Sequence, residues 1–237
     1  MISAIRKETF ENLQLNAGMF VANFDYSAIE TATELKAALM ALRAQNKVVD
    51  GNPIPESGAL LGATMGGGTF TATPTIRHIG ADGKRYEFKG STINDGWTIQ
   101  MTGTLKEVTA GTLATALVMA KVQVNGNVQK ITLHTDIEDD DYINSLVWVG
   151  DTSKGAALID LKNALNTAGV SMTFADRGEG TIPFTFTAHQ DDVEDYDQAP
   201  VEILFFTDPA AAAASAEPDG GQGEPAAYDP ETAPAEA

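Results

Sequence analysis

The strongest constraint on the fold is a strict alternation of residue types between residues 97 and 105. Apolar and polar side chains take turns along this stretch, with Trp97, Ile99, Met101 and Leu105 on one side and Thr98, Gln100, Thr102 and Thr104 on the other. A period of two is the repeat of a β-strand, whose successive side chains point to opposite faces of a sheet. We therefore expect the apolar face to pack on a core and the threonine-rich face to meet water.

The preceding residues predict two more strands. From Gly68 onward, β-forming residues run through an Asp82-Gly83 pair, which is typical of a tight turn. We expect two long β segments joined at this turn, with the strand from Trp97 as the third.

Elsewhere the pattern indicates short strands and two helices. Leucines at three- to four-residue spacing predict a helix over 27–47, with Ser27 or Thr31 as its N-cap, and Thr109 can cap a second helix that runs to about Ala120. Asn125-Gly126 predicts a type I′ hairpin between 122 and 133. Further strands are expected at 143–150, with Trp148 buried, and at 156–165, 170–174, 181–188 and 201–206.

These elements predict a mainly β protein: an antiparallel β-sandwich or flattened barrel with one or two flanking helices. We expect an N-terminal arm over 1–25 and a β-domain over 26–207, in which 48–68 is a long loop rich in glycine and proline. Residues 208–237 are acidic and rich in alanine and proline, which predicts a flexible tail.

The charge balance restricts the possible partners. The formal net charge is −18 at pH 7, whereas proteins that grip nucleic acid need lysine and arginine to displace its counterions. We expect no tight binding of DNA or RNA, although DNA can pass along such a surface without adhering. The sequence has no cysteine, no apolar secretory signal in MISAIRKETFENLQ and no segment of membrane-spanning length. We expect a protein made in the cytoplasm, with no membrane partner.

No catalytic, cofactor or metal site is predicted. The acidic runs at 136–141 and 191–197 lack the spacing of a calcium-binding EF-hand, and solvated loop charge is the simpler interpretation. His78, His134 and His189 stand without a nucleophile or zinc motif. Gly66, Gly67 and Gly68 lack the lysine of a phosphate-binding loop, which favours a hinge or a close-packing contact between subunits.

Positive charge concentrates around the Asp82-Gly83 turn, in the residues Arg77, His78, Lys84, Arg85 and Lys89. In so acidic a chain, a complementary contact with an acidic surface of a neighbouring copy is the favoured interpretation. A nucleic-acid site is the alternative, although only Tyr86 and Phe88 are there to stack on bases.

Three blocks carry a family resemblance. They are LQLNAGMFVANFD, LLGATMGGGTFTATPTIRHIGADGKRYEFKGSTINDGWTIQMTGTLKEVT, and INSLVWVGDTSKGAALIDLKNALNTAGVSMTFADRGEGTIPFTFTAHQDD. In this order, over most of 12–206, they resemble the major tail tube proteins of long-tailed, non-contractile bacteriophages. The segment around 27–47 and the acidic tail depart from that pattern.

The resemblance implies a β-sandwich subunit of the virion tail that forms six-membered rings, which stack into a hollow tube. It implies contacts with further copies, with the tape-measure protein and with tail-terminator and distal tail proteins, while the genome passes through the lumen during ejection. A negative, threonine-rich lining that includes Thr98, Gln100, Thr102 and Thr104 would keep DNA moving.

Other functions stay open. A capsid decoration or adhesion protein is also β-rich and acidic but forms trimers, and the inner tube of a contractile injection machine has a sheath partner. A carbohydrate-active enzyme needs a carboxylate pair and an aromatic platform, and two tryptophans with loop-bound acids disfavour it.

Overall fold

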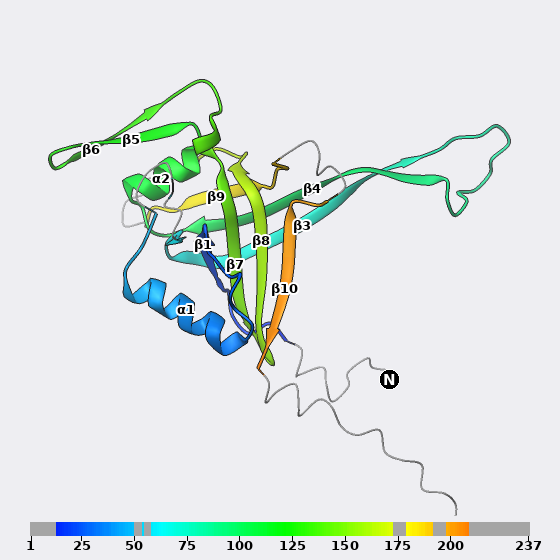
Figure 1. The fold of residues 1–237 in the computed structure, drawn as a ribbon. Coiled ribbons are helices and arrows are strands. Elements are labelled where there is room, and N and C mark those ends of the chain that lie inside the picture. The colour runs from blue at the N-terminus through cyan, green and yellow to red at the C-terminus, as the bar shows by residue number, and fades with distance from the viewer. Residues whose placement is uncertain (1–12, 50–53, 55–57, 173–178, 192–197, 209–237) are drawn as a thin grey trace, which may run out of the picture.

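The computed structural model describes residues 13–49, 54, 58–172, 179–191 and 198–208. The elements are β1 Met19–Ala22, α1 Ala32–Ala44, β2 Ala59–Leu60, β3 Thr64–His78, β4 Thr92–Leu105, α2 Ala110–Leu117, β5 Ala120–Asn125, β6 Val128–Leu133, a 3-10 turn at Asp139–Asp141, β7 Ile143–Thr152, β8 Gly155–Asn166, β9 Ile182–Thr187 and β10 Val201–Thr207. The mainly β prediction is confirmed (Figure 1).

Eight strands form one antiparallel sheet in the order β2-β1-β7-β8-β9-β4-β3, with β10 also paired to β8. Strand β8 is where this sheet bends. It pairs with β10 over Gly155–Leu161 and then, at Leu165 and Asn166, with β9. Asn163 lies between these two stretches with a φ of 44°, a left-handed conformation that asparagine tolerates. Strands that change partner at such bends form the corners of packed sheets.

The two parts of the sheet share a core. Phe20 from β1 meets Phe184 from β9 edge to face, with ring centroids 5.2 Å apart, and Met101 and Leu105 from β4 are buried in the same cluster. Of the predicted sandwich or flattened barrel, the described residues form no closed barrel, since the long strands β3 and β10 each pair with one neighbouring strand only. Within this part of the chain the sheet therefore stays open between β3 and β10.

Helix α1 covers the opposite face of β1, β7 and β8. Leu35 and Leu39 pack there against Val147 and Leu158. Of the two predicted caps, Thr31 is the one used: its hydroxyl accepts from Glu34 N, and the Glu34 carboxylate accepts from Thr31 N. The helix therefore begins later than residue 27. The predicted cap Thr109 begins α2 in the same way, and that helix ends earlier than expected, at Leu117.

Three predictions about strands and turns need correction. The Asp82-Gly83 pair lies inside a loop over 79–91, so that β3 and β4 form one long hairpin and β4 begins at Thr92. Val170 belongs to no strand, and 173–174 lie outside the described residues. In the confirmed hairpin β5–β6 the connecting residues are Gly126 and Asn127. Only Gly126 of these two has a positive φ, which indicates a type II′ turn.

Candidate assembly surfaces

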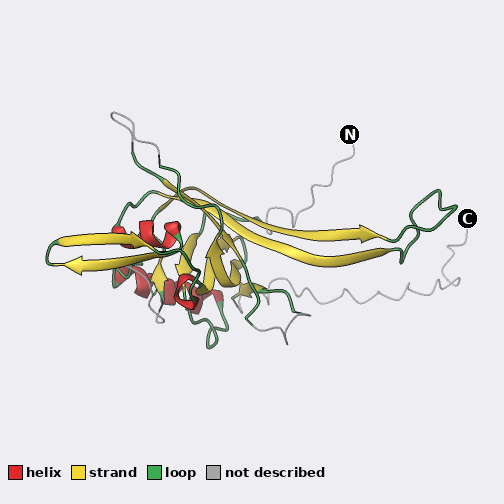
Figure 2. Ribbon diagram, turned by 90° about the horizontal axis from the view of Figure 1, so that it is seen from above, coloured by secondary structure: helices red, strands yellow, loops and turns green. Residues whose placement is uncertain are grey.

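The outer parts of β3 and β4, with the loop between them, project from the body of the molecule as a long two-stranded ribbon (Figure 2). We call residues 72–99 the projection. Its register runs from Ala72 opposite Ile99 to His78 opposite Thr92. Trp97 was predicted to face the core, but it lies on this ribbon and is 54% exposed. Apolar and polar residues do alternate along β4, but β4 extends beyond the core. At Trp97 its apolar face is therefore exposed to solvent.

A β-bulge and an ion pair fix the outer half of the projection. The register of β3 and β4 shifts between Thr75 and Ile76, where Asp95 is the extra residue. Arg77 donates to both Asp95 carboxylate oxygens, at 2.8 and 3.0 Å. These hydrogen bonds lower the pKa of Asp95 and raise that of Arg77. Arg77 was predicted to contact another subunit, and the structure gives it this partner within the chain.

Lys84 lies at the centre of the loop over 79–91. Its ammonium group donates to the Ile79 carbonyl at 2.9 Å, the Glu87 carboxylate at 2.6 Å and the Ser91 hydroxyl at 3.0 Å. The side chain is only 9% exposed. The hydrogen bond from Lys84 is the main reason why the pKa of Glu87 is lowered. Lys84, another predicted contact residue, thus organises this loop.

Two predicted contact residues remain exposed at the end of the projection. Arg85 and Lys89 have no ion pair with any residue that the structure describes. Tyr86 and Phe88 beside them are 80% and 65% exposed. We call residues 85–89 the tip, which combines two cations with two aromatic rings.

Gly66, Gly67 and Gly68 belong to β3 and not to a loop as predicted. Gly66 and Gly67 have φ values of 76° and 75°, and the register with β4 is irregular between Thr64 and Gly68. Such a bulge favours glycine because other residues are strained at positive φ. Gly68 has no such φ, and its role is a different one: the lack of a side chain allows β3 to pass close to Phe20.

The predicted threonine face exists and extends over three strands. Thr98 is exposed, and Gln100, Thr102 and Thr104 are half-buried. The register places β3 and β9 residues beside them, adding Thr69, Thr71, Thr73, Pro183, Thr185 and Thr187. Gln100 donates to the Thr187 hydroxyl at 3.1 Å. These residues carry no charge, so the expected negative character does not come from this face itself.

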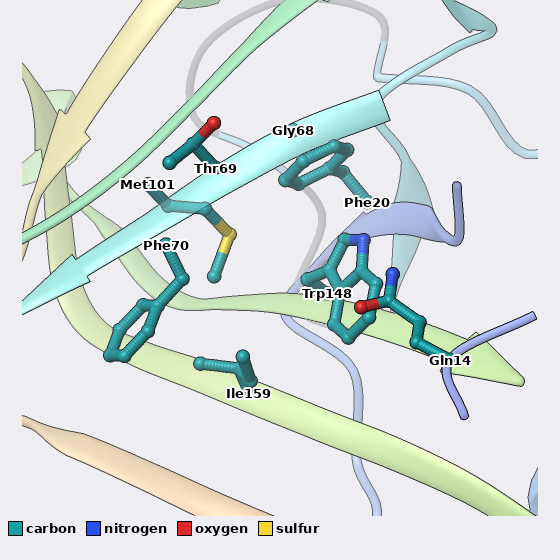
Figure 3. A pocket seen from close by; sticks show the side chains of 8 residues that line it. All are labelled: Gln14, Phe20, Gly68, Thr69, Phe70, Met101, Trp148 and Ile159. Atoms are coloured by element: carbon teal, nitrogen blue, oxygen red, sulfur yellow. The ribbon is translucent and has the colours of Figure 1, made fainter. Parts of the chain in front are cut away.

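An apolar pocket lies where β3 passes over β7 and β8 (Figure 3). It has a volume of about 100 Å³ and is lined by Gln14, Phe20, Gly68, Thr69, Phe70, Met101, Trp148 and Ile159. Trp148 is half-buried rather than buried as predicted; its indole nitrogen donates to the Ala17 carbonyl at 3.0 Å. A groove continues past Ile159 to Ile203 and Phe205 of β10, and Phe205 is 75% exposed. This lining suits an apolar contact and not an acid–base reaction.

The acidic turn, residues 136–141, follows hairpin β5–β6. Lys121 bonds the Glu138 carboxylate at 2.5 Å and lowers the pKa of Glu138. Asp136, Asp139 and Asp140 are exposed. His134 Nε2 and Asp141 Oδ1 lie 3.2 Å apart. Within the described residues, no group of three or more His, Asp or Glu side chains could hold a metal ion. Residues 192–197 of the second acidic run lie outside the residues that the structure describes.

The other histidines are not brought together. His78 contacts Glu87 on the projection, whereas His189 stacks edge to face on Tyr142, with centroids 5.4 Å apart.

One buried polar network was not foreseen from the sequence. Asp160 on β8 is fully buried and accepts from Tyr26, Ser145 and Lys162. Burial, followed by hydrogen bonds to Glu202 and Asp160, raises the pKa of Tyr26. The sequence predicted a strand over 156–165 but not the burial of Asp160, because Tyr26 and Glu202 of this network come from segments distant in the chain.

Comparison of the sequence with protein-family models and with curated proteins finds no match. No helix in the described part of the chain is long and apolar enough to cross a bilayer.

Proposed function

We propose that this protein is a structural subunit of a phage tail tube, which forms six-membered rings that stack around a central channel. The observation that carries the proposal is that the two long edge strands, β3 and β10, pair on one side only within the described residues. An unpaired strand edge exposes backbone hydrogen-bonding groups and is a template for another chain. Ring closure between copies would satisfy both edges.

Two further features support self-assembly. The groove beside β10 leaves Ile203 and Phe205 exposed, and apolar patches of this kind mark interaction sites. The projection carries Trp97 and Ile76 into solvent, where a neighbouring subunit would cover them. A monomer does not need these features for its own stability.

The threonine face is the candidate channel lining. Uncharged hydroxyl and amide groups give a phosphate backbone no cation to bind, so DNA would slide past them without counterion release. The overall charge of −18 would repel DNA at longer range. In the tail, the tape-measure protein would fill the channel before ejection, and tail-terminator and distal tail proteins would contact the two ends of the tube.

Electron microscopy of the purified protein in negative stain, with light scattering, tests the proposal. Six-fold rings or tubes are expected as concentration rises. Trimers at all concentrations would favour a decoration or adhesion protein instead, and monomers would refute self-assembly. Tubes that recruit a sheath protein would identify a contractile machine.

A further inference from the structure

We infer that the tip of the projection docks on the acidic turn and hairpin β5–β6 of a second copy of this chain. The inference rests on the proposed self-assembly and identifies the surface that receives the projection. It starts from hairpin β5–β6, which belongs to no larger sheet among the described residues. A two-stranded hairpin is marginally stable by itself in water.

One face of this hairpin is apolar and incompletely covered. The register places Val122 beside Ile131 and Ala120 beside Leu133 on that face, with Val124 next along β5. Ala120 is buried near α2, but Val124 and Leu133 are 64% and 67% exposed. The polar face carries Lys121 and Lys130. The outer part of the apolar face thus lacks a partner within the described chain.

The acidic turn beside this hairpin is complementary to the tip in charge and also exposes an apolar side chain. Asp136, Asp139 and Asp140 are exposed, without an ion pair to another described residue, and Ile137 between them is 53% exposed. The tip has the opposite charge: Arg85 and Lys89 are unpaired among the described residues, next to Tyr86 and Phe88. Apolar groups framed by complementary charges favour a specific contact and suppress wrong ones.

The two surfaces lie at opposite ends of the molecule. The projection and hairpin β5–β6 extend from the body in opposite directions (Figures 1 and 2). One copy cannot bring its own tip to its own hairpin without refolding. The contact is therefore head to tail between two copies, a geometry that closes a ring or propagates a stack.

Charge reversal tests the contact. We compare the parent with Arg85→Glu/Lys89→Glu, with Asp139→Lys/Asp140→Lys and with the combined four-residue variant. Lys84 and Asp141 are left unchanged because they organise their own loops. Each double variant should raise the concentration needed for half-assembly at least tenfold, and the combination should restore it. A double variant that assembles like the parent, or a combination as defective as either half, would overturn the inference.

Cysteine cross-linking gives a second readout that does not depend on reversed charges. The chain has no cysteine, so single substitutions are unambiguous. Under mild oxidation, a mixture of Lys89→Cys and Asp140→Cys proteins should form a mixed dimer, whereas Lys89→Cys with Glu30→Cys should not. Tubes without this mixed dimer would refute the docking site and leave the tube proposal intact. A parent that never assembles would refute the tube proposal itself.

Discussion

Gly68 and Phe20 are in direct contact across the core: a Cβ atom on Gly68 would lie 2.5 Å from Phe20 Cζ and 2.7 Å from the Thr102 carbonyl oxygen. Both neighbours are fixed, one in the aromatic core and one in the backbone of β4. Space, and not backbone conformation, excludes a side chain here, because the φ of Gly68 is outside the left-handed region.

Gly68→Ala should therefore destabilise the fold by about 1–3 kcal/mol, the usual cost of overpacking. Gly80→Ala is the matched control, since a Cβ there meets nothing within 4 Å, and it should be neutral or slightly stabilising. Urea unfolding followed by circular dichroism measures both. Equal stability of the two variants would contradict the close packing of β3 on β1.

In the network around Asp160, we expect two carboxylates of different burial to contribute differently to the free energy of unfolding. Asp160 is fully buried, and its removal takes an acceptor from Ser145, Lys162 and Tyr26, of which Lys162 and Tyr26 keep Glu202 nearby. Asp160→Ala should cost roughly 1–3 kcal/mol, as expected when a buried acceptor of several hydrogen bonds is removed. Glu202 accepts from the same Tyr26 hydroxyl but is exposed, so Glu202→Ala should cost less than about 1 kcal/mol. Thermal unfolding of both variants compares them, and a reversed order would refute this account.

The sequence predicted elements better than their connections. Alternation located β4 and β9, and short apolar runs located β7 and β8. Thr31, offered together with Ser27, and Thr109 were identified as caps because their side-chain chemistry is local. The lengths of β3 and β4 were missed because Asp82-Gly83 has the composition of a hairpin turn. The internal bonds of Lys84 make 79–91 a folded loop instead.

The features of the candidate assembly surfaces could be located from the sequence only in part. Basic residues near the turn were recognised from the sequence. It could not show that Arg77 and Lys84 have partners within the chain, while Arg85 and Lys89 have no ion pair with a described residue. The exposed groove at Phe205 and the isolation of β5–β6 depend on which strands pair. Strand pairing is set by contacts far apart in the chain, and local pattern does not report it.

Acid should loosen the loop over 79–91 before the body unfolds. The pKa of Glu87 is lowered, chiefly by the hydrogen bond from Lys84. A carboxylate with a lowered pKa stabilises the fold above its unfolded-state pKa and loses that effect as pH falls through the folded-state value. Below about pH 4, hydrogen exchange at 79–91 should accelerate while β7 and β8 stay protected. Glu87→Gln should remove this pH step, and a step that persists in that variant would assign it to another group.

Trp97 offers a direct report on whether the projection is covered in the assembled protein. The chain has two tryptophans, so Trp148→Phe leaves Trp97, which is 54% exposed in the single subunit, as the only tryptophan that emits. On assembly, its emission should move to shorter wavelength and its quenching by acrylamide should fall in proportion to the assembled fraction, because a neighbouring subunit replaces water around the indole. The same variant below its assembly concentration is the control. Visible tubes with unchanged quenching would place Trp97 in solvent and exclude the inner part of the projection from the contact between subunits.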